Sequence, residues 1–287
     1  MKPLPSWFKQ SIPEVSQLQA MKNLLTSASL HTVCEGALCP NLGQCWGQGV
    51  ATFMILGHCC TRACRFCAVP SGVPEDVDPE EPEAVAQAVK SLKLNYVVVT
   101  SVTRDDLPDE GADQFVAVIR AIRRVNPDVK VEILVPDFSG RGGLMEQVIL
   151  SRPEVIGHNI EMAERLFSDV RPQALYRRSL DVLRVYNEYE GCSLIKSGFM
   201  VGLGESREEV FQTMDDLAEA GCDIVTIGQY LAPSKHGRHV PVERFYTPEE
   251  FDEFKIYGEQ KGIRYILSGP LVRSSFIAEQ GYLKVTK

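Results

Sequence analysis

From residue 50 onward the sequence alternates short β-prone runs with amphipathic stretches, and this alternation limits the fold more than any other feature. The runs are rich in Val, Ile, Leu and Phe: 52–56, 96–100, 130–135, 155–158, 193–200, 224–227 and 265–267. The stretches between them repeat apolar residues at helical spacing, as 111–124 does. Six or seven such units follow one another with no clear reversal point. We therefore predict an α/β fold, a partial (β/α) TIM-type barrel of about six parallel strands.

Local signals mark where helices begin and end. Three segments place a capping residue three positions before a glutamate: 78–81, 206–209 and 247–250. Pro79 and Pro248 would then occupy the first helical position. Three glycines, Gly191, Gly221 and Gly262, stand where helices are expected to stop.

The two ends of the chain do not share the alternating pattern. Residues 1–49 are broken by prolines and predict an N-terminal extension with one short helix at 15–25. Residues 266–287 form a C-terminal segment. We expect both to cover the mouth of a barrel made by residues 50–265, because the chemistry of such barrels lies at the carboxyl ends of the strands.

Charge and hydropathy exclude several functional classes. A net charge of -8 and a pI near 5.3 disfavour nucleic acid as a partner. The N-terminus lacks the apolar core of a signal peptide. Residues 37–61 are uncharged apart from His58, but Pro40, Asn41 and Gln44 do not suit a lipid-facing helix. We expect a cytoplasmic protein without a membrane or nucleic-acid partner.

Six of the nine cysteines form two clusters. The N-terminal triplet consists of Cys34, Cys39 and Cys45. The loop triplet, which follows the first predicted strand, consists of Cys60, Cys64 and Cys67. Clustered cysteines in odd total number indicate metal binding in a reducing compartment rather than disulfides. Thiolates select zinc, copper(I) or iron–sulfur clusters, and three of them leave one iron of a cubane open for another ligand.

An ordinary four-ligand zinc or iron–sulfur site is the structural alternative, with Cys59 or His58 completing a triplet. We nevertheless expect Cys59 to point away from Cys60 and to pack. Cys192 and Cys222 lie in or beside apolar strands and are expected to be small buried hydrophobes.

These motifs carry a family resemblance. The loop triplet, with Phe66 before its last cysteine, resembles the signature of the radical S-adenosylmethionine superfamily. The N-terminal triplet and the run Arg273-Ser274-Ser275-Phe276 are similar to the pattern of one family within it, the lipoyl synthases. Other stretches resemble the same family: 100–108, 158–161, 196–198, 202–205, 228–230 and 268–270. The sequence departs from the family pattern at Phe276, where tyrosine is usual, and at Cys59.

The resemblance implies a radical sulfurtransferase with two 4Fe-4S clusters and S-adenosylmethionine as cofactors. The loop triplet would bind the cluster that cleaves S-adenosylmethionine, and the resulting 5'-deoxyadenosyl radical would remove hydrogen from C6 and C8 of an octanoyl-lysine. The N-terminal triplet would hold an auxiliary cluster that donates two sulfur atoms, with Ser275, or alternatively Ser274, as fourth ligand. An octanoylated lipoyl-carrier protein and an electron donor such as flavodoxin or ferredoxin would be the partners.

Residues at strand ends are expected to bind S-adenosylmethionine: Thr100, Ser101, Asn159, Glu161, Arg171 and Lys196. By resemblance the first two meet the methionine amino group. Asn159 and Glu161 are expected to bond the ribose or the amino acid part, and Arg171 or Lys196 to neutralise a carboxylate. The structural alternatives are a solvated charge at Lys196 and, for residues 104–106, a capped turn with ion pairs.

Two other functions stay open at this point. A zinc-binding interaction protein on an α/β scaffold would bind about one zinc ion per site and would not cleave S-adenosylmethionine. Another sulfur-inserting radical enzyme, resembling biotin synthase or a methylthiotransferase, would lack the N-terminal triplet combined with the terminal serine motif.

Overall fold

The computed structural model describes residues 4–10, 15–189, 191, 193–234 and 237–287. The chain divides into two compact units. The N-unit comprises Ser11–Arg62 and Ala68–Ile156, and the C-unit comprises Met1–Gln10, Ala63–Cys67 and Gly157–Lys287. Of the loop triplet, Cys60 belongs to the N-unit, and Cys64 and Cys67 belong to the C-unit.

Parallel strands form the centre of the N-unit. β2 (Thr52–Ile55), β3 (Tyr96–Ser101) and β4 (Lys130–Leu134) pair in parallel, with Thr52 opposite Val98 and Tyr96 opposite Lys130. β1 (His31–Thr32) pairs antiparallel with β2, and β5 (Val155–Gly157) begins at the end of this unit. All four residues of β2 and the first five of β3 are buried, as expected for parallel strands covered on both faces.

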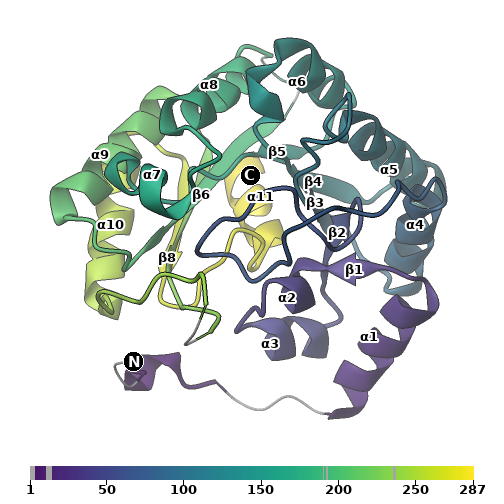
Figure 1. Ribbon diagram of the computed structural model, residues 1–287, viewed down its shortest axis with the longest axis horizontal. Helices are drawn as coiled ribbons and strands as arrows, with labels where there is room; N and C mark the ends of the chain where they lie inside the picture. The colour runs from purple at the N-terminus through teal and green to yellow at the C-terminus, as the bar shows by residue number, and fades with distance from the viewer. Residues whose placement is uncertain (1–3, 11–14, 190, 192, 235–236) are drawn as a thin grey trace. The chain divides into compact units, whose positions relative to one another are not determined.

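Helices of the N-unit follow the strands in sequence. They are α1 (Val15–Ser27), α2 (Val33–Gly36), α3 (Leu42–Gly47), α4 (Glu81–Ser91), α5 (Ala112–Val125), η2 (Phe138–Gly140) and α6 (Gly142–Ile149). In Figure 1, α4 and α5 lie side by side on the outer side of β2–β4. The apolar side of α5, with Phe115, Val118, Ile119 and Ile122, has no exposed surface, which explains its helical apolar spacing.

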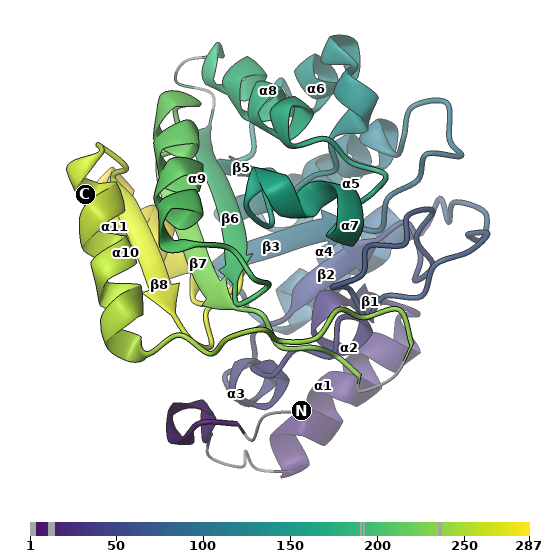
Figure 2. The ribbon, with the colours of Figure 1, turned by 60° about the vertical axis from the view of Figure 1, so that its left-hand side comes forward.

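The C-unit repeats the same construction. β6 (Leu194–Val201), β7 (Ile224–Gln229) and β8 (Tyr265–Gly269) pair in parallel. The helices are η1 (Ser6–Phe8), η3 (Glu164–Leu166), α7 (Phe167–Val170), α8 (Tyr176–Asn187), α9 (Arg207–Glu219), α10 (Pro248–Gln260) and α11 (Ala278–Thr286). α9 packs beside α10, and both α10 and α11 pack on β8 (Figure 2).

The strand predictions are confirmed within about two residues. Each of the seven predicted runs coincides with one strand from β2 to β8. β1 was not predicted because two residues are too short to show a period, and α11 was not predicted either. Cys222 is buried, as expected for a small hydrophobe. Cys192 lies outside the described residues. Within the described part of the chain, no helix is long and apolar enough to cross a membrane.

Two of the three predicted capping boxes are confirmed. The Ser206 hydroxyl accepts from the Glu209 amide at 3.3 Å, and the Glu209 carboxylate accepts from the Ser206 amide at 2.8 Å. Thr247 and Glu250 make the same exchange. Gly221 follows α9 in the left-handed region with φ 83°, a conformation that favours glycine. Gly262 does the same after α10, whereas α8 already ends at Asn187, before Gly191.

The prediction for residues 78–81 is wrong. α4 begins only at Glu81, and Asp78 instead accepts a hydrogen bond from the Glu80 amide at 2.9 Å. The Glu81 carboxylate turns inward and accepts from the Leu56 amide at 3.0 Å and from the Gln114 side chain at 2.7 Å. These buried donors need an acceptor, so the glutamate satisfies them rather than its own helix.

Candidate iron–sulfur sites

The N-terminal triplet lies on two short helices of the N-unit. Cys34 is on α2, Cys45 is on α3, and Cys39 lies in the turn between them. Backbone hydrogen bonds fix this turn, from the Cys39 amide to the Cys34 carbonyl at 3.0 Å and from the Cys45 amide to the Asn41 carbonyl at 2.9 Å. The Thr32 hydroxyl caps α2 by accepting from the Glu35 amide at 3.3 Å.

The three thiols of the N-terminal triplet interact. Burial, followed by the neighbouring Cys34 and Cys39, raises the pKa of Cys45 to about 12. Burial also raises the pKa of Cys34, with Cys39 adding to the shift. Three thiolates gathered in this way repel one another, and a shared cationic metal group removes that cost. The donor set therefore fits an iron–sulfur cluster, which thiolates ligate.

A buried indole N–H lies beside this triplet. Trp46 follows Cys45 on α3, and its Nε1 interacts with the Cys34 thiol and lowers the pKa of that thiol, against the larger effect of burial. Beyond this weak contact with sulfur, Nε1 has no hydrogen-bond partner among the described residues. A buried N–H directed at a ligand sulfur fits a site that receives a sulfur-rich group.

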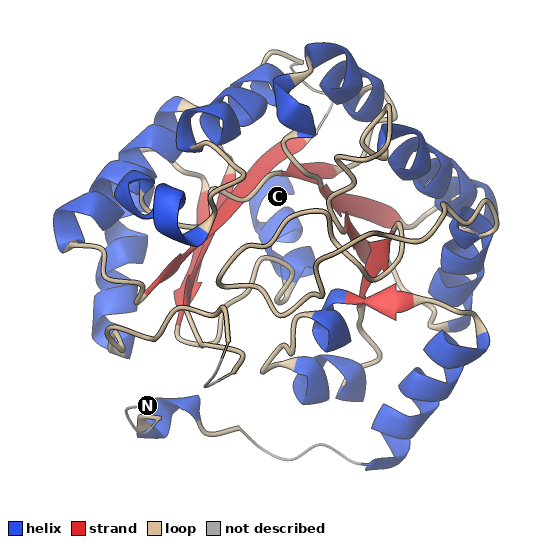
Figure 3. Cartoon of the chain, in the orientation of Figure 1, coloured by secondary structure: helices blue, strands red, loops and turns tan. Residues whose placement is uncertain are grey.

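Cys60 lies in the loop that follows β2; loops and turns are tan in Figure 3. Two backbone amides donate to its sulfur, Arg62 N at 3.4 Å and Thr103 N at 3.3 Å. The Cys60 amide donates to the Pro70 carbonyl at 2.8 Å, and the Gly72 amide donates to the Cys60 carbonyl at 3.0 Å. Cys60 thus occupies a fixed position with donors already directed at its sulfur, which suits a thiolate ligand.

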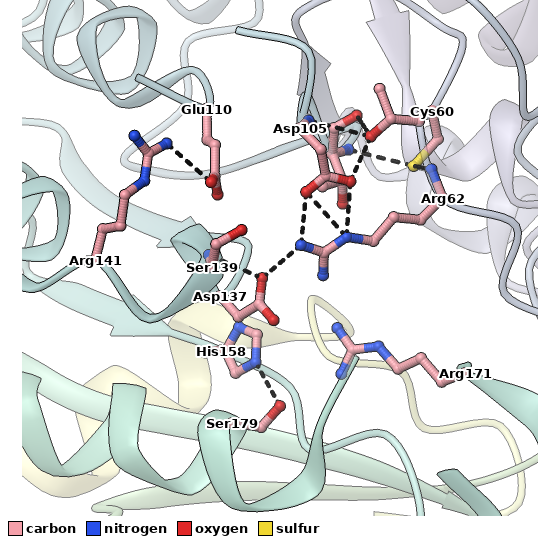
Figure 4. Close-up of polar contacts among 12 residues, drawn as sticks. Cys60, Arg62, Asp105, Glu110, Asp137, Ser139, Arg141, His158, Arg171 and Ser179 are labelled. Atoms are coloured by element: carbon pink, nitrogen blue, oxygen red, sulfur yellow. Dashed lines mark hydrogen bonds and ion pairs between the residues drawn. The ribbon is translucent and has the colours of Figure 1, made fainter. Parts of the chain in front are cut away.

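A buried arginine fastens this loop inside the N-unit. The Arg62 guanidinium donates to Asp105 through Nε at 2.9 Å and Nη2 at 2.7 Å, and to Asp137 through Nη2 at 2.7 Å (Figure 4). Burial lowers the pKa of Arg62, but the hydrogen bonds that its guanidinium donates to both aspartates outweigh this effect and raise the pKa. Arg104 forms a separate ion pair with Asp106 at 2.8 Å. Of the ion pairs expected within residues 104–106, Arg104 forms the one with Asp106, whereas Asp105 pairs with Arg62.

The other two cysteines of the loop triplet lie in the C-unit, under the segment that follows β7. Arg238 Nη2 and His239 Nε2 contact the Cys67 carbonyl oxygen at 3.1 and 2.9 Å. The Val240 amide donates to the Arg65 carbonyl at 3.0 Å, and the Arg65 amide donates to the Val170 carbonyl at 2.8 Å. Cys64 and Cys67 are both half-buried.

The terminal serine motif packs on β6 and β7. The Ser274 hydroxyl donates to Asn159 Oδ1 at 2.7 Å, whereas the half-buried Ser275 has no side-chain partner among the described residues. A Cβ at Gly228 would lie 2.1 Å from the Val272 carbonyl oxygen. A Cβ at Gly198 would lie 3.2 Å from the Ser274 hydroxyl. The two glycines allow the motif to lie directly on the strands.

The predicted cofactor residues of the N-unit lie at the end of β3. Thr100 is buried, and its hydroxyl donates to the Leu134 carbonyl at 3.0 Å. The Ser101 hydroxyl is buried without a partner in the described part of the chain. Thr100 is thus occupied by the sheet, whereas Ser101 retains its full hydrogen-bonding capacity.

The predicted cofactor residues of the C-unit are arranged around Asn159. Arg171 Nη1 donates to the Asn159 carbonyl at 3.3 Å, and Arg171 Nε is buried without a partner among the described residues. Burial raises the pKa of Glu161, while Arg171 and Asn159 act in the opposite direction. Lys196 is only 4% exposed, so the alternative of a solvated charge is wrong for this residue.

Several residues of these sites were not predicted from the sequence. Arg62 lies inside the loop triplet, but its partners are 43 and 75 positions away. Trp46, Arg238 and His239 were likewise missed. The only signal for Trp46 was its position next to a ligand cysteine. Within the described residues, no three His, Cys, Asp or Glu side chains are placed to hold one metal ion.

Comparisons with known proteins identify close relatives. The family model of the Radical SAM superfamily matches residues 54–217, more than half of the chain. The lipoyl synthase of Rubrobacter xylanophilus is 52% identical over 96% of this chain and 85% of its own length. The lipoyl synthase of Flavobacterium psychrophilum is 48% identical over 97% of this chain and 95% of its own. The mitochondrial lipoyl synthase of Nematostella vectensis is 47% identical over 97% and 95%.

Solved structures share the fold at low sequence identity. Methylornithine synthase matches with a TM-score of 0.55 and 12% identity, covering 94% of this chain and 86% of that chain. HydG, a maturase of the FeFe hydrogenase, matches with a TM-score of 0.59 and 14% identity, covering 81% and 54%. With the parallel strands described above, these likenesses confirm the predicted class, a partial (β/α) barrel.

Proposed function

The chain belongs to the lipoyl synthase family of the radical S-adenosylmethionine superfamily, and from this membership we propose which of its residues carry the reaction. Members are sulfur-inserting enzymes with two 4Fe-4S clusters and S-adenosylmethionine. With these groups bound, S-adenosylmethionine is cleaved to a 5'-deoxyadenosyl radical that removes hydrogen from C6 and C8 of a protein-bound octanoyl-lysine, and two sulfur atoms are inserted. The identities near 50% over almost the whole chain do not favour the zinc-binding or biotin synthase-like alternatives.

We assign the sulfur-donating cluster to the N-terminal triplet. The observation that carries this assignment is that three cysteines from one turn and two short helices gather beside a buried indole N–H, where burial, with neighbouring thiols adding to it, raises the pKa of Cys34 and Cys45. The triplet is held by the backbone of two short helices, and Cys34 and Cys45 lie on these helices. A cluster consumed in each turnover needs ligands that keep their arrangement while its iron and sulfur are exchanged.

We assign its fourth ligand to Ser275 rather than Ser274. The Ser274 hydroxyl is already engaged by Asn159 at 2.7 Å, while the Ser275 hydroxyl has no partner among the described residues. A hydroxyl oxygen is a harder ligand than thiolate and holds iron more weakly. Such a ligand suits a cluster that must come apart. The serines and the arginine match the family motif, so Phe276 removes only the hydrogen bond that a phenol would make.

The loop triplet is assigned to the cluster that cleaves S-adenosylmethionine. Two backbone amides aimed at the Cys60 sulfur support this assignment. We propose that Thr100 and Ser101 bind the methionine amino group, and that Asn159 and Glu161 bind the ribose or the amino acid part. Arg171 or Lys196 would neutralise the carboxylate. The buried unpartnered atoms of Ser101 and Arg171 are the donors most available for these roles.

The domain roles and partners are further parts of the proposal. Residues 1–49 would supply the sulfur-donating site, residues 50–265 the barrel and residues 266–287 the serine ligand. An octanoylated lipoyl-carrier protein or domain would be the substrate, and a flavodoxin or ferredoxin the one-electron donor. The clustered cysteines, which form no disulfide among the described residues, support a reducing, cytoplasmic location.

One anaerobic experiment tests the function. The chain is reconstituted with iron and sulfide, reduced, and incubated with S-adenosylmethionine and an octanoyl-lysine peptide. We expect a brown protein with about eight irons, 5'-deoxyadenosine, and a peptide that gains two sulfur atoms. A colourless zinc protein, or the absence of both products, would contradict the proposal.

A further inference from the structure

We propose that Arg62, through its ion pairs with Asp105 and Asp137, is a positioning residue that sets the reduction potential of the cluster bound at Cys60. It would do so by holding two backbone N–H donors on the Cys60 sulfur. The inference rests on the proposed function, because it requires a cluster at Cys60.

The ion pairs join the two segments that carry these donors. One donor is the amide of Arg62 itself, and the other is the amide of Thr103. Asp105, two residues after Thr103, receives Arg62 Nε and Nη2 in a two-point contact. The Thr61 hydroxyl lies 2.8 Å from Asp105 Oδ2 and 3.0 Å from the Thr103 carbonyl oxygen. Sliding of one segment past the other would therefore break side-chain and backbone contacts together.

The network is deeply buried on one side. The Arg62 side chain is 4% exposed and that of Asp137 is fully buried, whereas that of Asp105 is 33% exposed. Buried ion pairs of this kind contribute little net stability, and apolar side chains of similar size would serve a core equally well. The network's planar, two-point geometry instead fixes one arrangement of the loop. Arg62 Nη1 is buried without a partner among the described residues, so the arginine is not fully satisfied by its structural contacts.

Hydrogen bonds to a cluster sulfur have a defined electrostatic effect. Reduction adds negative charge to the cluster, and N–H donors stabilise that charge, so they raise the reduction potential. At Cys60 the two amide nitrogens lie 3.4 and 3.3 Å from the sulfur, within the range of hydrogen bonds to sulfur. Small displacements of the loop would weaken both bonds. The arginine thus acts through the backbone, without touching the cluster.

Arg104, one residue after Thr103, offers a matched control. Arg104 is 2% exposed and makes a two-point contact with Asp106, as Arg62 does with Asp105. Its Nη1 also donates to the Leu56 carbonyl, outside the segment 60–62. Arg62→Lys and Arg104→Lys therefore each keep the charge and remove a buried fork, but only the first removes a side-chain contact between the segments 60–62 and 103–105.

The experiment measures the midpoint potential of the Cys60 cluster by redox titration followed with EPR. All chains carry alanine at the three cysteines of the N-terminal triplet, so that one cluster is observed. Arg62→Lys is expected to shift the midpoint to more negative potential by about 59 mV, the equivalent of a tenfold change for one electron. Arg104→Lys is expected to leave it at the parent value. Asp105→Asn and Asp106→Asn, which each remove one negative charge, provide a second pair with the same expected contrast.

Defined outcomes would overturn the inference. The inference would be overturned if the midpoint potentials were equal for Arg62→Lys and Arg104→Lys and also for Asp105→Asn and Asp106→Asn. A loss of iron in Arg62→Lys with the remaining cluster titrating at the parent potential would show a purely structural role. A parent chain that takes up no EPR-active cluster would overturn the proposed function itself, and the two failures are thereby distinguished.

Discussion

The N-terminal triplet lies on helices α2 and α3 and in the turn between them, held by backbone hydrogen bonds and the Thr32 cap, whereas the segment around Cys60 is fixed by buried ion pairs. Cys34 is buried with the thiols of its triplet around it, and the thiols of the loop triplet are all half-buried. Arg62, Asp105 and Asp137 anchor the second site through buried ion pairs. This difference matches the proposed roles, in which the loop triplet keeps its cluster and the N-terminal triplet gives up the sulfur of its own.

The largest effect is expected from the loop triplet. Cys64→Ala should reduce both 5'-deoxyadenosine and thiolated peptide to background, because a cubane with two thiolates cannot present one open iron to S-adenosylmethionine. Product analysis by mass spectrometry measures both. The control is Cys222→Ala, which changes a buried cysteine just after α9 and should retain both products. If Cys64→Ala formed 5'-deoxyadenosine at the parental level, the loop triplet would not hold the cluster that cleaves S-adenosylmethionine.

The N-terminal triplet should separate the two products. Cys39→Ala is expected to abolish sulfur insertion while 5'-deoxyadenosine formation stays within about tenfold of the parent, because the other site is intact. Iron content should fall by about four. Thiolated peptide at the parental level from this variant would exclude a sulfur-donating role for the triplet.

The terminal motif should show a smaller, graded effect. Ser275→Ala removes the proposed ligand and should slow thiolated-peptide formation about 10–100-fold. Ser274→Ala removes only the hydrogen bond to Asn159 and should slow it less. Single-turnover kinetics of the two variants measure the order. The reverse order would assign the ligand to Ser274.

The smallest effect is expected at Trp46. Trp46→Phe keeps the ring and removes the indole donor, so the cluster of the N-terminal triplet should assemble but titrate at a more negative potential, with product formation changed by less than about tenfold. Trp7→Phe, at a partly exposed tryptophan, is the matched control. Identical potentials in the two variants would show that the indole N–H does not contact the cluster.

Sequence patterns predicted the parts of this molecule that depend on short-range order. The seven strands β2–β8 and the capping boxes at Ser206 and Thr247 follow from periodicity and local hydrogen bonding. The cysteine triplets were visible because their members lie within twelve residues of one another. One alternative treated Lys196 as a solvated charge, but the residue is buried, and its position on a strand does not reveal burial. The pairing of Arg62 with Asp105 rather than with a nearer acid depends on tertiary structure, which no local pattern contains.

The position of Glu81 has a consequence for metal uptake. Its carboxylate binds the Leu56 amide, and these two residues are the ends of the loop that carries Cys60. A closed loop has already lost most of its end-to-end freedom, whatever ion it later receives. The chain entropy is therefore lost during folding rather than during cluster assembly. Such preorganisation lets an apoprotein accept a preformed cluster without first searching for the geometry of its ligands.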